Sequence, residues 1–253
     1  MKSITSVLLL LATTLLFSCA TNGQINFNKT LDQATKDLNQ LGNQIGTGGA
    51  KPLTNDEVIR GLREALNVGT NNSTGSASKV DGYYKNPLVF IPFPPEAEKV
   101  KNTVENLGMK SQVTEFERSL NRAAEEAAKT AAPVFLDAIK GMSISDGFSI
   151  LKGADNAATD YLKNKTSNEL VAKFTPIIKN AIQKVEVTKY WKPLITAYNK
   201  VPLVEKQNPN LEQYVTTRAM DGLFKLIATE EKKIRTDPMA QITDLLKKVF
   251  GKK

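Results

Sequence analysis

Apolar residues recur at steps of three and four along most of the chain, and this spacing constrains the fold more than any other feature. Such steps place side chains on one face of an α-helix, whereas a half-buried strand alternates with a period of two. The segments that show the helical spacing most clearly are 27–45, 58–66, 113–131 and 211–234. The connections between them are short, which favours antiparallel neighbours. We therefore predict an all-α fold, a multi-helix antiparallel bundle, with a single helical domain over residues 53–253.

Several residue types mark where helices begin. Thr54 followed by Glu57 has the spacing of a capping box, and Thr166 with Glu169 repeats it, so each pair predicts a helix start. Proline lacks the amide hydrogen that a helix interior requires. We therefore expect Pro176 to interrupt one helix and the helix around Pro193 to begin anew there.

Residues 82–95 depart from the helical pattern, because four prolines are interleaved there with aromatic and aliphatic residues. Proline is excluded from helix interiors and from central strands. We expect an irregular, extended loop that is partly buried; a short edge strand over 88–91 is the alternative. Exposed aromatics and prolines are typical of interaction surfaces, so four residues are candidate contacts, with a loop packed over the core as the alternative: Tyr83, Tyr84, Phe90 and Phe93.

The N-terminus has the features of a bacterial lipoprotein signal. Lys2 precedes an apolar stretch over residues 4–17, which is too short for a membrane-spanning helix and suits a signal peptide. Residues 16–19 read Leu-Phe-Ser-Cys and resemble a lipobox. We predict a cleaved signal peptide over residues 1–18, lipid attachment at Cys19, and a tether with an amphipathic helix over 19–52. An ordinary secretory signal is the alternative.

The residues after the cysteine indicate which membrane would hold the anchor. Ala20 rather than aspartate follows Cys19, and no acidic run comes next. An outer-membrane anchor, with the body facing the periplasm, is therefore the expected location in the cell envelope. The partners that follow are the membrane, through the N-terminal lipid, and an envelope protein.

The amino-acid composition excludes several kinds of active site. The chain has no histidine and one cysteine, which the lipid would occupy, so Ser–His–Asp triads, Cys–His pairs and the usual zinc sites are excluded. No glycine-rich phosphate loop or calcium loop is present. We assign no catalytic residue, cofactor or metal. The net charge of +8 is spread along the chain without an aromatic-interleaved basic stripe, which argues against nucleic-acid binding.

Polar residues within otherwise apolar helices form a candidate polar cluster. Its members are Asn121, Arg122, Glu125, Asp146, Asp155 and Asp221. An interhelical ion pair or hydrogen bond is the structural alternative for Glu125, and helix capping is the alternative for Asp146. Asp221 precedes Gly222 inside a helical segment, an unfavourable pair that hints at close packing or function. Glu231 and Arg235 are expected on a solvated helix surface.

Several stretches together resemble the domain-of-unknown-function 4197 family. They are 61–66 (GLREAL), 121–125 (NRAAE), 150–153 (ILKG), 157–162 (AATDYL), 221–224 (DGLF) and 230–235 (EEKKIR). The resemblance covers nearly the whole mature chain and implies a helical envelope protein, often a lipoprotein. It implies no reaction and no catalytic residues.

Three functions remain open. The first is a non-enzymatic, membrane-anchored binding or structural protein. The second is a carrier or sensor of a small apolar ligand held between helices, in a cavity lined by Phe116, Phe135, Phe148 and Tyr161. The third is an envelope hydrolase that pairs Glu125 with Asp146 or Asp221 across an open cleft.

Overall fold

The computed structural model describes residues 54–184, 187–207, 209–241 and 243–250. The chain divides into two units, after Pro52, and the described residues belong to the second unit. The predicted signal peptide, Cys19 and the tether with its amphipathic helix lie outside the described residues.

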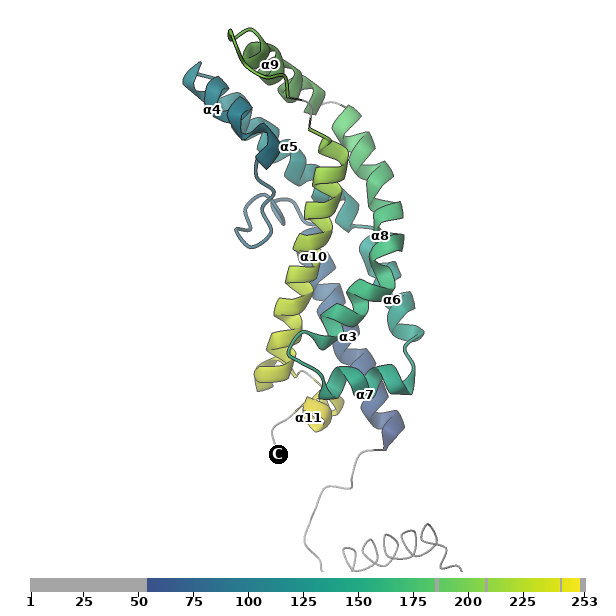
Figure 1. Ribbon diagram of the computed structural model, residues 1–253. Helices are drawn as coiled ribbons and strands as arrows, with labels where there is room; N and C mark the ends of the chain where they lie inside the picture. The colour runs from purple at the N-terminus through teal and green to yellow at the C-terminus, as the bar shows by residue number, and fades with distance from the viewer. Residues whose placement is uncertain (1–53, 185–186, 208, 242, 251–253) are drawn as a thin grey trace, which may run out of the picture. The chain divides into compact units, whose positions relative to one another are not determined.

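The described residues are all-α, with helices joined by turns and loops and no strand (Figure 1). Within them, no helix combines the length and the apolar content needed to cross a bilayer. The elements in chain order are α3 (Asn55–Ala77), η1 (Pro95–Ala97), α4 (Glu98–Asn106), α5 (Lys110–Ala128), α6 (Ala131–Lys140), α7 (Ile144–Lys152), α8 (Ala157–Lys184), α9 (Val187–Asn199), α10 (Leu211–Thr236), η2 (Pro238–Ala240) and α11 (Asp244–Phe250).

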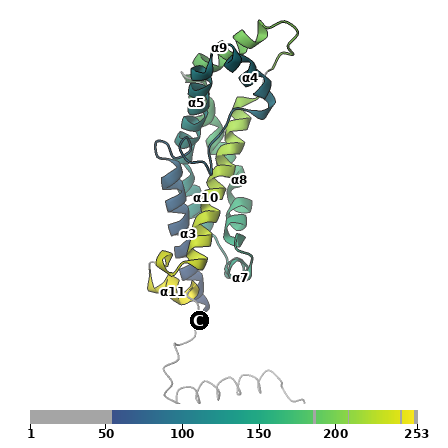
Figure 2. The same ribbon diagram turned by 90° about the vertical axis from the view of Figure 1, so that its left-hand side faces the viewer.

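Long helices run side by side in alternating directions. In Figure 1, α3 and α8 ascend, whereas α5 and α10 descend, and α6 continues downward below α5. Helix α10 packs against α3, α5 and α8. Helices α4 and α9 lie together at one end of this unit, and α7 and α11 lie at the other end (Figures 1 and 2). The predicted antiparallel arrangement is thus present.

The core forms where the helical stripes meet. Phe116, Leu120, Phe174 and Leu223 are fully buried and belong to one continuous apolar cluster. Each such side chain contributes about 1.5–3 kcal/mol through burial. The small residues of α5 let α8 and α10 approach it closely; the buried alanines are Ala123, Ala124, Ala127 and Ala128.

Local capping signals are realised at two helix ends. The Thr54 side chain accepts a hydrogen bond from the Glu57 N–H at 3.2 Å, and Glu57 accepts from the Thr54 N–H at 2.9 Å. This reciprocal pair is the predicted capping box of α3. Gly108 ends the α4 segment with φ of +86°, a conformation that glycine adopts without steric cost.

Three predicted helix boundaries are wrong. Helix α8 runs unbroken through both Thr166 and Pro176, and α9 runs through Pro193. Thr166 is 1% exposed, and its hydroxyl donates to the Leu162 carbonyl at 2.7 Å instead of capping a new helix. Tertiary packing of the buried residues on both sides, such as Leu170, outweighs the local signals.

Candidate functional site

One face of α5 carries three polar side chains at four-residue intervals: Glu117, Asn121 and Glu125. This spacing places them one turn apart on the same side of the helix. Each of them accepts a hydrogen bond from the backbone of the upstream segment 79–94. We call this segment the clamped loop and the three residues the α5 ladder.

Asn121 makes the most complete contact of the ladder. Its Oδ1 accepts from the Ile91 N–H at 2.8 Å, and its Nδ2 donates to the Ile91 carbonyl at 2.8 Å. Asn121 and Ile91 are both 0% exposed. The side-chain amide therefore satisfies two buried backbone groups that have no strand partner.

Glu125 holds the start of the clamped loop. Its Oε1 accepts from the N–H groups of Tyr83 and Tyr84 at 3.1 and 3.2 Å, and its Oε2 pairs with Arg122. Arg122 also pairs with Asp81, whose backbone is left-handed with φ of 68°. Hydrogen bonds from Lys85 and then from Arg122 lower the pKa of Asp81. The carboxylate of Glu125 is thus used to fix a turn.

Glu117 holds the other end of the loop. Its Oε1 accepts from the Phe93 N–H at 3.2 Å and from Lys101 Nζ of α4 at 3.1 Å. The ladder therefore fixes the loop at both ends and at Ile91 in between.

The inner side of the clamped loop packs on α10. The Tyr83 hydroxyl donates to the Ala219 carbonyl at 2.6 Å, and the Tyr214 hydroxyl donates to the Pro92 carbonyl at 3.1 Å. Burial raises the pKa of Tyr83. A Cβ on Gly222 would lie 2.8 Å from the Tyr83 ring, so the glycine permits this close approach. Close packing explains the unfavourable Asp221–Gly222 pair noted in the sequence.

The outer side of the same loop presents a mixed aromatic and cationic surface. The Tyr84 and Phe90 rings lie 6.0 Å apart, and the Arg118 guanidinium lies 5.2 Å from the centre of the Tyr84 ring. Leu88, in the same loop, is 46% exposed. We call Tyr84, Leu88, Phe90 and Arg118 the loop patch. Of the four aromatics chosen from the sequence, Tyr83 and Phe93 are buried, at 0% and 2% exposure, and cannot contact a partner directly.

The structure brings together only part of the candidate polar cluster. Asn121, Arg122 and Glu125 act together on the clamped loop, as described above. Asp146 caps α7 through Ser143, Asp155 is exposed between α7 and α8, and Asp221 lies half-buried on α10. No hydrogen bond or ion pair within the described ranges joins these three aspartates to Arg122 or Glu125.

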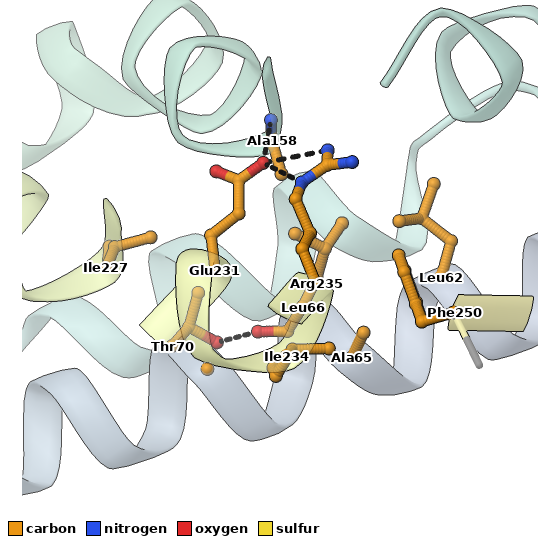
Figure 3. A pocket seen from close by; sticks show the side chains of 11 residues that line it. Leu62, Ala65, Leu66, Thr70, Ala158, Ile227, Glu231, Ile234, Arg235 and Phe250 are labelled. Atoms are coloured by element: carbon orange, nitrogen blue, oxygen red, sulfur yellow. Dashed lines mark hydrogen bonds and ion pairs between the residues drawn. The ribbon is translucent and has the colours of Figure 1, made fainter. Parts of the chain in front are cut away.

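A second buried polar centre, around Glu231, was not predicted from the sequence. Glu231 on α10 is 8% exposed, where a solvated position was expected. It accepts from the N–H groups of Ala158 and Thr159 at 2.9 and 2.8 Å. It also pairs with Arg235 at 2.9 Å, and Figure 3 shows this ion pair together with the bond from Ala158. The carboxylate thus binds the positive N-terminus of α8. The i,i+4 pair was visible in the sequence, but its burial depends on how α8 meets α10.

A small cavity lies beside this ion pair. Its volume is about 30 Å³, enough for one or two waters and far below the roughly 300 Å³ of ligand pockets. Figure 3 shows it between α3, α10 and Phe250. The residues that line it are Leu62, Ala65, Leu66, Gly69, Thr70, Ala158, Ile227, Glu231, Ile234, Arg235 and Phe250.

Two of the four aromatics proposed to line a ligand cavity, Phe116 and Phe135, lie in separate contacts. Phe116 packs on Phe93 and on Trp191, with ring centroids 4.9 and 5.1 Å apart. Phe135 instead meets Phe224 edge-on at 5.9 Å. These rings fill the core at two places, so this geometry gives the carrier hypothesis no support.

Comparison with known proteins identifies one family. The family model described as "Protein of unknown function (DUF4197)" matches residues 52–251, which include every helix from α3 to α11. No curated protein and no solved structure matches the chain.

Proposed function

Because the chain belongs to the DUF4197 family, which carries no assigned function, we propose its role from its own geometry. It is a lipid-anchored envelope protein without catalytic activity, and its helical body presents the loop patch to a protein partner. The observation that carries this proposal is the rigid attachment of the patch-bearing loop to the α5 ladder.

Preorganisation supports a binding role. A mobile loop must be ordered when it binds, which costs about 0.5–1.5 kcal/mol for each immobilised side chain. In this protein the N–H groups of Tyr83, Tyr84, Ile91 and Phe93 are already bonded to α5. The loop patch is therefore held in place before a partner arrives.

The composition of the patch supports the same role. Tyrosine and arginine are enriched among the residues that dominate binding energies at protein interfaces. Tyr84 and Arg118 provide these groups at the surface, with the Arg118 guanidinium over the Tyr84 ring at 5.2 Å, and Phe90 adds a second ring 6.0 Å from that of Tyr84. Leu88 adds an exposed aliphatic side chain.

The use of the buried carboxylates supports a non-catalytic role. Glu125 accepts two backbone hydrogen bonds and pairs with Arg122, and Glu231 accepts two backbone hydrogen bonds and pairs with Arg235. A general acid or base must exchange its proton with a substrate. Carboxylates fixed in this way instead stabilise the fold.

The anchor is supported by the lipobox-like residues 16–19, and mass spectrometry tests it directly. In the native bacterium, wild-type protein should sediment with outer membranes and yield an N-terminal peptide that begins with diacylglyceryl-modified Cys19. Cys19→Ala should abolish the modification and the membrane association. An unmodified Cys19 in soluble wild-type protein would contradict the anchor.

Crosslinking in intact cells tests the binding role. A photoreactive residue at position 85, beside the patch, should give a discrete crosslinked product. Phe90→Ala and Leu88→Asp should each weaken it by about 10-fold or more, as expected for central interface residues. Leu136→Asp is the matched control, because Leu136 is 38% exposed on α6, away from the loop.

Two results would argue against this role. One is a crosslinked product of equal yield in the Leu88 and Leu136 variants. The other is release of soluble fragments from purified cell-wall glycan by wild type but not by Glu125→Gln, which would favour the hydrolase.

A further inference from the structure

Helix α9 has two different faces. Leu194 and Tyr198 are buried, at 0% and 2% exposure, against the rest of the unit. Lys189, Lys192 and, just beyond the helix, Lys200 share the opposite face, since Lys189 and Lys192 are three residues apart, just under one turn, and eleven residues, about three turns, separate Lys189 from Lys200.

These lysines line a shallow surface groove between α9 and the end of α4. Its volume is about 740 Å³, and its lining residues are Leu107, Lys189, Lys192, Pro193, Thr196, Ala197, Lys200, Val201 and Pro202. No ion pair engages the three lysines within the described parts of the chain; Lys189 lies over the Tyr190 ring at 5.4 Å. Residues 187–207 contain four lysines and one glutamate, a local net charge of +3.

Two solvent-exposed leucines lie at the same end of the unit as the lysines. Leu107 is 57% exposed at the end of α4, and Leu203 is 106% exposed in the turn after α9. Leu203 also has φ of 64°, in the left-handed region. That conformation is unfavourable for a bulky residue, and Leu203 gains no packing in return. A leucine that neither local conformation nor burial explains points to a contact outside the chain.

We propose that this end of the protein, which we call the α9 tip (Leu107, Lys189, Lys192, Lys200 and Leu203), binds the anionic phospholipid surface of a membrane. The ammonium groups would lie at the lipid phosphates, and the leucines would enter the boundary between headgroups and acyl chains. Proteins that lie on membranes combine these two kinds of side chain in the same way.

A lipid surface fits the geometry better than an acidic protein does. Leu203 projects from the turn and is not among the residues that line the groove. A protein partner would need a matching pocket for it, whereas a bilayer deforms around a projecting side chain. Helices α4 and α9 lie at the same end of this unit, so the leucines and lysines can meet one surface (Figures 1 and 2).

Vesicle flotation tests the proposal with the mature chain from Ala20, made without its lipid, so that the result does not depend on Cys19. We expect binding to vesicles of phosphatidylcholine with phosphatidylglycerol and little binding to phosphatidylcholine alone. Added salt should weaken it. The triple variant Lys189→Gln, Lys192→Gln, Lys200→Gln should bind on the order of 100-fold more weakly, since each lysine contributes a factor of about five near an anionic surface.

A matched triple variant controls for net charge. Lys140→Gln, Lys225→Gln and Lys232→Gln removes the same charge from exposed helical positions elsewhere and should change binding by less than about threefold. If this control loses as much affinity as the tip variant, or if wild type binds neutral and anionic vesicles equally, the proposal is overturned.

Leu203→Asn separates membrane contact from folding. Asparagine tolerates the left-handed conformation, so the variant should be at least as stable as wild type. Its vesicle binding should nevertheless fall about 10-fold through the loss of apolar contact. Unchanged binding of this variant would overturn the leucine contact. If the wild-type α9 tip captures an acidic soluble protein and does not bind vesicles, the proposal as a whole is overturned.

Discussion

The Asn121 side chain bonds both backbone groups of Ile91, accepting from its N–H and donating to its carbonyl, each at 2.8 Å. The two residues are 30 positions apart and both fully buried. An amide side chain thus replaces the neighbouring strand that an extended segment usually needs. This contact lets a proline-rich loop cross the surface of a helical bundle without leaving buried polar groups unpaired.

Asn121→Ala should destabilise the protein by about 2–4 kcal/mol, because it leaves the buried N–H and the buried carbonyl of Ile91 without a hydrogen-bond partner. Urea unfolding followed by circular dichroism measures this change. The loop should also become sensitive to limited proteolysis between residues 79 and 94.

Ser119→Ala is the control for this prediction. Ser119 lies on the same helix and is 5% exposed, but its hydroxyl bonds the local Phe116 carbonyl. It should cost about 1 kcal/mol or less and leave the loop protected. Equal losses of unfolding free energy in the two variants would contradict a special stabilising role for the Asn121–Ile91 hydrogen bonds.

Two helical glycines should respond in opposite directions to alanine. In Gly75→Ala the new Cβ meets nothing within 4 Å, so better helix propensity should stabilise the protein by about 0.5–1 kcal/mol. In Gly222→Ala the Cβ lies 2.8 Å from the Tyr83 ring and 3.1 Å from Val89, so overpacking should destabilise by about 1–3 kcal/mol. Thermal unfolding measures both, and a stabilised Gly222 variant would refute the close approach.

Glu231→Ala should cost about 3–5 kcal/mol, because it leaves Arg235 without its carboxylate partner, with only the bond to the Ile150 carbonyl, and removes the acceptor of the first N–H groups of α8. The adjacent Glu230→Ala provides the comparison. Glu230 pairs with the exposed Lys233 and accepts a surface hydrogen bond from the Asn72 side chain at 2.9 Å, so its loss should cost about 1 kcal/mol or less. Chemical denaturation distinguishes the two, and similar values would contradict a buried role for Glu231.

Stability should fall at alkaline pH through Tyr83. Burial raises the pKa of Tyr83 above its ordinary value near 10, so the unfolded chain releases this proton first. The contribution to stability is therefore complete below about pH 10 and is lost as the pH rises further.

Tyr83→Phe should lessen this alkaline loss, while lowering stability near neutrality by about 1 kcal/mol through the missing bond to Ala219. Unfolding free energies between pH 7 and 11.5 measure both effects. An identical alkaline loss in the Tyr83 variant would contradict the prediction.

Much of the fold could be predicted because helix formation is a local property. Apolar spacing gave the helical class, and Thr54 with Glu57 gave the start of α3. The same local signal was wrong at Thr166, which lies inside α8. Burial of its neighbours on both sides keeps the helix continuous. That burial cannot be inferred from the few residues around Thr166.

The candidate polar cluster could be predicted in part. Asn121 and Glu125 stood out because each is polar on an apolar helix, but their partners are backbone groups 30 to 42 residues upstream. Asp155 had the same appearance in the sequence and is exposed. Residue type alone did not separate a clamp from a solvated side chain.

The sequence by itself determined the helical character of the body, the capping box of Thr54 and Glu57, and the absence of histidine, which excludes several kinds of active site. Each of these depends on residues close together in the chain or on a simple count. Only the tertiary structure decided that Glu231 is buried, that Tyr83 and Phe93 face inward, and that Leu203 stands fully exposed. The physical reason is that burial and pairing depend on which helices meet. Glu231 and Ala158, for example, are 73 residues apart and become neighbours only when α8 and α10 pack together.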